Sequence, residues 1–140
     1  MLIGVQRSSS DLLAFLDDDI RVNKWTLRSL AQGLRQGVGV TTGYSVEVPS
    51  VRALTSYLVM VYRAINLLGF TNEQVNYCWG GCFCCSRGTY EELRMREIWT
   101  DGCYSDDMVF GDVLKRAGLR IAAPETNMFV NRINCNSFWR

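Results

Sequence analysis

The order of apolar and polar positions in the first third of the chain predicts a strand, a helix and a second strand. Residues 11–16 are apolar after the first aspartate, which is typical of a buried central strand in a parallel sheet. Residues 23–34 have helical spacing behind Asn23, a residue type that favours the N-cap. The buried face expected for this helix comprises Trp25, Leu27, Leu30 and Leu34. Residues 38–44 are rich in β-branched side chains, so the order of elements indicates an α/β layer fold.

The middle of the chain predicts a long helix, a strand interrupted by glycine, and a short helix. Residues 49–68 have helical spacing after a proline and a serine. Residues 76–87 predict a strand or a strand pair that is interrupted by Gly80 and Gly81. A glycine pair in such a run often marks a close approach of the backbone to a ligand or to another segment. Residues 88–97 predict a short charged helix.

The last third predicts a well-delimited helix and one more short strand. Ser105 is the expected N-cap, and Asp106 and Asp107 occupy the first turn, where the helix dipole favours negative charge. Gly118 is a natural C′ residue, and residues 119–124 predict the strand. The expected buried face of the helix comprises Val109, Phe110, Val113, Leu114 and Ala117. The sequence has no internal repeat or linker, so we expect one domain.

Composition and charge exclude several classes of function. The chain has 140 residues and a formal net charge of +1, with no Lys/Arg-rich run, which argues against nucleic acid as a partner. Histidine is absent, which excludes Ser-His-Asp and Cys-His catalysis and His-ligated zinc. Acid–base chemistry would therefore depend chiefly on carboxylates.

Four of the six cysteines lie within residues 78–85. Residues 1–11 lack the long apolar region of a signal peptide, so reduced thiols are expected. Packed or pocket-lining thiols are the first interpretation. A disulfide and a metal site are the alternatives, although the crowded spacing does not repeat a C-x-x-C pattern.

Residues 53–62 form the most apolar stretch and are flanked by Arg52 and Arg63. This stretch is shorter than the roughly 18 apolar residues of a membrane-spanning helix. It is either an ordinary buried amphipathic helix or a helix that lies at a membrane surface.

Three aspartates, Asp17, Asp18 and Asp19, follow the first predicted strand directly. They contain an Asp-x-Asp pair, and ligands of open α/β sheets bind beyond the carboxyl ends of strands. Carboxylates in this arrangement can hold Mg²⁺ or Mn²⁺, which prefer oxygen ligands and substrate phosphates. Binding of a cation would relieve the repulsion between the three charges. The alternative is an acidic cluster in a loop or at a helix cap.

Asp106 and Asp107 form the second carboxylate pair. The structural interpretation is compensation of the helix dipole. The functional interpretation is a general base that takes a proton from an attacking hydroxyl.

Three ordered blocks, "FLDDDI", "WGGCFCCSRGTYEEL" and "YSDDMVFGDVLKRAGLRI", together resemble the inverting family 2 type glycosyltransferases, especially the ceramide glucosyltransferase-like branch. The resemblance runs from about residue 10 to the end of the chain. It implies the C-terminal part of a GT-A fold, with a mixed, mostly parallel sheet flanked by helices. It also implies transfer of a hexose from a nucleotide-sugar donor, typically UDP-glucose, to a hydroxyl of ceramide, another lipid or a glycan.

The resemblance also implies roles for individual residues. Asp17 and Asp19 would hold Mn²⁺ or Mg²⁺ on the donor diphosphate, with Asp18 contacting the substrate. Asp107 would be the catalytic base, with Asp106 beside it. The sugar and acceptor pocket would be lined by Trp79, Gly80, Gly81 and Cys82.

Two expected parts of the family are not recognised in this sequence. They are the N-terminal nucleotide-binding half and the Q-x-x-R-W box with its flanking membrane helices. We therefore expect residues 1–140 to be one partial catalytic domain or a truncated gene product, with one edge of its sheet unpaired. The larger enzyme would be membrane-associated, with its active site facing the cytosol. The alternative function is a non-catalytic interaction module with a truncated transferase fold, and a small Cys-cluster metal-binding protein is the third hypothesis.

Overall fold

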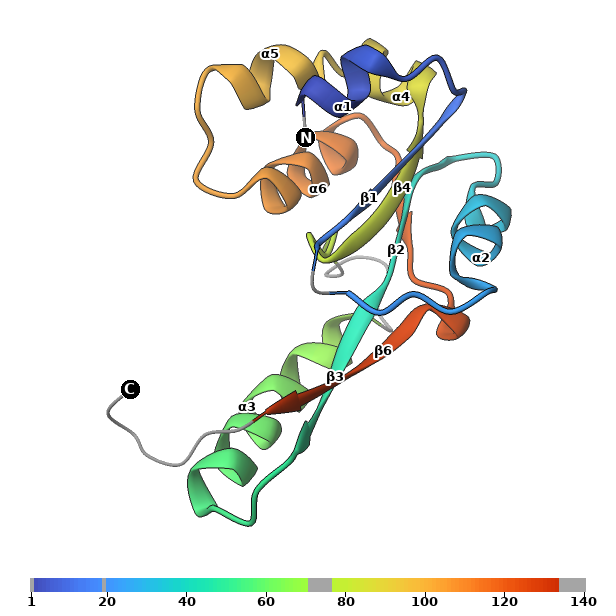
Figure 1. Cartoon of the computed structure of the whole chain (residues 1–140). Helices are drawn as coiled ribbons and strands as arrows, with labels where there is room; N and C mark the ends of the chain where they lie inside the picture. The colour runs from blue at the N-terminus through green and yellow to red at the C-terminus, as the bar shows by residue number, and fades with distance from the viewer. Residues whose placement is uncertain (1, 19, 71–76, 134–140) are drawn as a thin grey trace.

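A four-stranded mixed sheet forms the centre of the chain, and a two-stranded sheet extends from it (Figure 1). The computed structural model describes residues 2–18, 20–70 and 77–133. In chain order the elements are α1 (Leu2–Arg7), β1 (Leu12–Leu16), α2 (Thr26–Gly33), β2 (Val38–Thr42), β3 (Tyr44–Pro49), α3 (Leu54–Phe70), β4 (Cys82–Ser86), α4 (Arg87–Glu92), α5 (Met95–Thr100), α6 (Asp106–Arg116), β5 (Arg120–Ala122), η1 (Glu125–Asn127) and β6 (Met128–Ile133). The expected class, α/β with a mixed sheet flanked by helices, is confirmed.

The strand order in the larger sheet is β1-β4-β2-β5. β4 is antiparallel to both β1 and β2, and β2 is parallel to β5. β3 and β6 pair in parallel in the smaller sheet. The prediction of a mostly parallel sheet is therefore wrong, because antiparallel pairs are as numerous as parallel pairs among the described strands.

The strand at 11–16 exists, but the prediction of a buried central parallel strand is wrong. Its described partner is β4 alone, so β1 lies at an edge of the sheet. Leu13 and Phe15 are buried, whereas Leu12 and Leu16 are 44% and 41% exposed. The run looked continuous because its solvent-facing positions are also apolar, and apolar residues are common on protein surfaces.

The chain passes from the larger sheet to the smaller one at Gly43, between β2 and β3. The N–H of Gly43 donates to the carbonyl oxygen of Cys82 at 2.7 Å. A Cβ at Gly43 would lie 2.6 Å from the ring of Phe129, so a larger residue does not fit there. Neither β3 nor β6 was predicted, and α3 begins at Leu54, later than expected. Parallel pairing between segments so far apart in sequence leaves no local signal.

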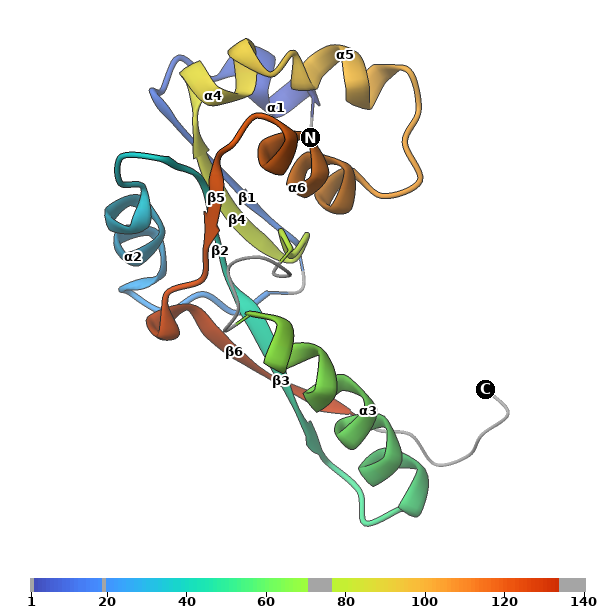
Figure 2. The ribbon, with the colours of Figure 1, turned by 180° about the vertical axis from the view of Figure 1, so that it is seen from behind.

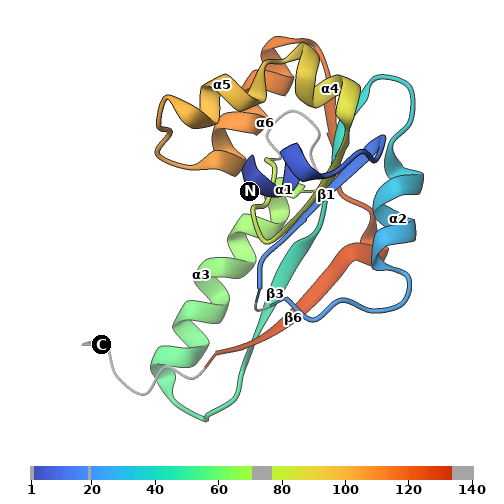
Figure 3. The ribbon, with the colours of Figure 1, turned by 45° about the horizontal axis from the view of Figure 1, so that its top comes forward.

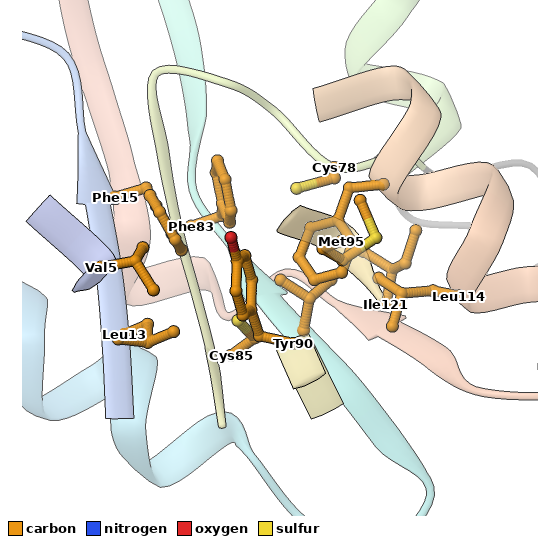
Figure 4. Close-up of a cluster of buried hydrophobic side chains, with 12 residues drawn as sticks. Val5, Leu13, Phe15, Cys78, Phe83, Cys85, Tyr90, Met95, Leu114 and Ile121 are labelled. Carbon is orange, nitrogen blue, oxygen red and sulfur yellow. The ribbon is translucent and has the colours of Figure 1, made fainter. Parts of the chain in front are cut away.

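Helices cover both faces of the larger sheet. Figures 1 and 3 show α2 on one side of it and α1, α4, α5 and α6 on the other. Under the four helices, Phe15 of β1 and Phe83 of β4 stack with ring centroids 4.6 Å apart. Figure 4 shows this cluster, which comprises Val5, Leu13, Phe15, Val40, Cys78, Phe83, Cys85, Tyr90, Met95, Phe110, Leu114 and Ile121. The smaller cluster, on the side of α2, comprises Leu30, Cys82, Cys84 and Phe129.

The buried face predicted for α2 is wrong in part. Leu30 is fully buried, but Trp25 and Leu27 are 51% and 55% exposed. Thr26 fills the covered position instead, at 0% exposure. Asn23 does not cap the helix, since its Oδ1 accepts the N–H of Trp25 in a turn that precedes it.

The helices on the opposite face follow the prediction more closely. α6 ends before Gly118, whose φ of +73° suits glycine, although Ala117 is exposed and does not join the buried face. The expected charged helix is divided into α4 and α5 at Arg94, which adopts a left-handed φ of 53°.

We predict that Ala14→Lys reduces concentration-dependent self-association without changing the fold. The N–H of Asp17 donates to Gly81 and the carbonyl oxygen of Asp11 accepts from Arg87, the two residues that flank β4. The alternate positions of β1, Ala14 among them, therefore direct their backbone groups to the open edge. A lysine there hinders edge-to-edge pairing. Sedimentation velocity would measure the change, with Leu27→Lys on α2 as the control. An equal reduction in both variants would contradict the role of the edge.

Candidate functional site

Two adjacent glycines, Gly80 and Gly81, form hydrogen bonds to the residue after β1 and to the first turn of α6. The N–H of Asp17, which follows β1, donates to the carbonyl oxygen of Gly81 at 3.1 Å. The N–H of Gly80 donates to Oδ2 of Asp107 at 2.8 Å. The structure therefore brings together the two carboxylate motifs, which lie far apart in the sequence, through the backbone of one turn.

The Asp107 carboxylate accepts three hydrogen bonds from the described residues. Oδ2 accepts the bond from Gly80, and Oδ1 accepts bonds from the N–H of Met108 at 2.8 Å and from the hydroxyl of Ser105. A carboxylate has about four acceptor positions, which leaves one on Oδ2. Asp107 is half-buried, so a hydroxyl that approaches the turn could bind at this oxygen.

The aspartates themselves cap the start of α6. The expected N-cap position of Ser105 is confirmed, although its side chain forms no capping hydrogen bond. Oδ1 of Asp106 accepts the N–H of Asp107 at 2.9 Å. The indole N–H of Trp99 donates to the Asp106 carbonyl oxygen at 3.1 Å, which ties α5 to the same turn. These bonds agree with the structural interpretation of the acidic pair and fix the Asp107 side chain in place.

The close approach expected of the glycine pair is confirmed. A Cβ at Gly80 would lie 2.8 Å from Oδ2 of Asp107. A Cβ at Gly81 would overlap the indole ring of Trp79. Both positions therefore require glycine for reasons of space, independently of their backbone angles.

Trp79 anchors the turn on the other side of the sheet. Its N–H donates to Oγ1 of the buried Thr42 at 2.8 Å. Its half-buried ring lies 5.6 Å from the ring of Phe129 and packs against the cluster beneath α2. Sequence reasoning missed Thr42, because a threonine in a β-branched strand carries no signal of this contact.

The interpretation of the clustered cysteines as packed thiols is confirmed for those in the described residues. Cys78, Cys82, Cys84 and Cys85 are buried free thiols, and Cys103 is half-buried and free. Cys82, expected to line the pocket, has no exposed surface. Burial raises the pKa of Cys82 and of Cys85 to about 12, with the nearby Cys84 adding to both, so these thiols stay protonated at neutral pH.

The charge of Asp107 affects the pKa values of Tyr77 and Cys78, which precede the glycine turn. Burial raises the pKa of Cys78 well above its ordinary value, and the Asp107 carboxylate raises it further. Burial and then Asp107 also raise the pKa of Tyr77, whose ring lies 4.5 Å from that of Phe70 in α3. Tyr77 is thus a neighbour of the site that sequence reasoning did not select, although it adjoins the "CWGG" motif.

The first carboxylate motif is only partly described. Asp17 and Asp18 are exposed at the end of β1, and Asp19 lies outside the described residues. Within the described ranges, no group of three or more Asp, Glu, Cys or His side chains is placed to hold a metal ion. The predicted pair Asp17 and Asp19 consequently stays a prediction.

A surface hollow of about 1000 Å³ lies away from this turn. It is lined by Gly33, Arg35, Val38, Tyr44, Leu67, Phe70, Arg120, Ile121, Ala122, Ala123, Pro124, Glu125 and Met128. None of the predicted site residues contributes to it. The glycine turn is a candidate site because of the hydrogen bonds of Asp107 around it, not because of a large cavity.

The chain matches no protein-family model, and no curated protein matches it. The resemblance to glycosyltransferases rests on the three sequence blocks. In the structure the first block ends β1, the second contains the glycine turn, β4 and α4, and the third contains α6 and β5. The blocks thus contribute adjoining elements around one turn.

We predict that Gly80→Ala lowers the free energy of unfolding by about 1–3 kcal/mol, because the new Cβ displaces the Asp107 carboxylate and breaks its bond to the turn. Urea denaturation would measure this loss. Gly88→Ala in α4 is the matched control, since the nearest atom to its Cβ would be Oγ of Ser86 at 3.7 Å. Equal midpoints for Gly80→Ala and the unsubstituted protein would show that the contact contributes nothing.

Proposed function

We propose that this chain contains the metal-binding and base residues of an inverting hexosyltransferase with a GT-A fold. The enzyme would move a hexose, such as glucose from UDP-glucose, to a hydroxyl group of a lipid or glycan. The observation that carries the proposal is the junction at Gly80 and Gly81, which bonds Asp17 on one side and Asp107 on the other. A metal ligand and a general base are needed within one substrate length of each other.

The first motif suits a hard divalent cation. Asp17 and Asp18 present exposed carboxylates at the end of a strand, and carboxylate oxygens are preferred ligands of Mg²⁺ and Mn²⁺. Such ions commonly use one or two carboxylates together with substrate phosphates. Asp17 and Asp19 would hold the ion, and bound there it would neutralise charge on the departing diphosphate.

Asp107 would act as the general base. Its Oδ2 keeps an acceptor position after the bond from Gly80, while Met108 and Ser105 hold the other oxygen. The acceptor hydroxyl would give its proton to Oδ2 as its oxygen forms a bond to the anomeric carbon. The bond from that carbon to the diphosphate oxygen breaks in the same step, and the electron pair leaves with the diphosphate. A single displacement of this kind inverts the anomeric centre.

The remaining residues would shape the pocket. Gly80 and Gly81 allow the backbone of the turn to approach both the carboxylate and the substrate. Trp79 and the buried Cys82 would support this turn from beneath, since both pack in or against the cluster under α2. Asp18 would contact the donor from the end of β1.

The competing proposal is a non-catalytic interaction module, in which Asp107 only fixes the turn. Its three hydrogen bonds within the protein are compatible with that role. The two proposals differ in what the site binds: the module needs no nucleotide, whereas the enzyme needs a nucleotide diphosphate and a divalent cation.

We predict that Asp107→Asn in the native protein lowers hexosyl transfer by about 10²–10⁴-fold, because the amide cannot accept the proton. Mn²⁺-dependent UDP binding, measured by calorimetry, should be nearly unchanged. Asp112→Asn, at an exposed position of the same helix, is the control. In the same assay, Asp17→Asn combined with Asp19→Asn should abolish Mn²⁺-dependent UDP binding.

Two results would refute these roles. Normal turnover by Asp107→Asn would exclude this residue as the base. Unchanged metal dependence in the Asp17→Asn and Asp19→Asn variant would exclude the first motif as the metal site. Thermal unfolding followed by circular dichroism would separate either result from a loss of folding.

A further inference from the structure

The outer face of α3 is apolar and exposed along the whole helix. The side chains concerned are 45–73% exposed and comprise Leu54, Tyr57, Leu58, Val61, Tyr62, Ile65 and Leu68. Their spacing of three and four residues places them on one side of the helix, within an arc of roughly 140°. Figure 2 shows α3 running beside β3, away from the four helices that cover the larger sheet. This helix is therefore amphipathic in the reverse sense, with apolar residues facing outward.

The charged residue of α3 lies on the opposite side. Arg63 is the one charged residue in the sequence of the helix, and its Nη1 pairs with Oε1 of the buried Glu47 in β3 at 2.7 Å. Residues 50–70 contain no aspartate, glutamate or lysine, and Arg52 precedes the helix. The outward face thus presents no carboxylate, and the charges near it are cationic.

The apolar surface continues beyond the helix. Val48 of β3 and Val130 of β6 are 42% and 61% exposed. A groove of about 550 Å³ separates α3 from β3, and most of its lining is aliphatic. Contiguous exposed apolar surface of this extent is typical of an interaction site.

We propose that the outer face of α3 lies on the surface of a lipid bilayer, with the helix parallel to the membrane plane. Protein interfaces usually have a polar rim and about one hydrogen bond per 100–200 Å². This face offers hydrogen-bonding groups only through Tyr57 and Tyr62, and tyrosine is a residue that favours the membrane–water interface. Arg52 suits anionic headgroups, and the absence of carboxylates removes repulsion from them.

No helix in the described ranges has the length and apolar character needed to cross a membrane. The 17 residues of α3 extend about 25 Å. Phe70, the last residue of α3, packs on Tyr77 beside the glycine turn. The bound membrane would therefore lie within one helix length of the candidate site. The inference does not depend on the proposed function.

Flotation of the purified chain with vesicles tests this inference. The vesicles would be phosphatidylcholine alone and phosphatidylcholine mixed with phosphatidylglycerol. The test variant is Leu58→Gln with Ile65→Gln, and the matched control is Leu27→Gln with Ile3→Gln. The four positions have similar exposure, at 47% and 60% against 55% and 67%. Because all four are exposed, both variants should fold.

The unsubstituted chain and the control should float with the vesicles, more so when phosphatidylglycerol is present. The α3 variant should partition about tenfold less, because it loses apolar contact with the lipid. Failure of the unsubstituted chain to float, or equal flotation of both variants, would overturn the proposal. Dimerisation that is detected by light scattering, lost in the α3 variant and unaccompanied by flotation would instead assign the face to a second copy.

Discussion

The hydrogen bond between Gly80 and Asp107 is the constraint on which the candidate site depends. It closes a turn that also pairs with the end of β1, so three segments of the chain meet within a few residues. The contact requires glycine on one side, since a Cβ would displace the carboxylate. On the other side, Ser105 and Met108 fix the second oxygen of Asp107. The segment that follows β1 and the start of α6 are thereby held against the same turn.

The sequence was most informative where the signal was local. The helix 106–116 could be predicted because its acidic first turn, basic last turn and C′ glycine all lie within the segment. The edge position of β1 could not be predicted, because its solvent-facing positions are as apolar as its buried ones. β3 and β6 were missed because each is completed by a partner far along the chain. The pattern of apolar residues along a segment can indicate a strand, but it does not identify the strand with which that segment pairs.

The same distinction applies to the site and to α3. The sequence identified the aspartate pairs and the glycine pair, but not the bond that joins Gly80 to Asp107, because such a bond is formed only after folding. Thr42 and Tyr77 were not selected, since their roles come from neighbours in space. Periodicity correctly indicated a helix with an apolar face over most of 54–70. Only the fold shows that this face points away from the sheet.

Paramagnetic broadening by Mn²⁺ in the presence of UDP tests the central claim most directly. The ion quenches nuclear resonance signals near its binding site, and amide spectra of the ¹⁵N-labelled chain would locate it. The account predicts selective loss of the amide signals of Asp17, Gly80, Gly81 and Met108, while those of α2 and the distal end of β3 persist. Loss centred on other carboxylates, such as Glu91 and Glu92 of α4, or no selective loss, would contradict a metal–diphosphate site at the glycine turn.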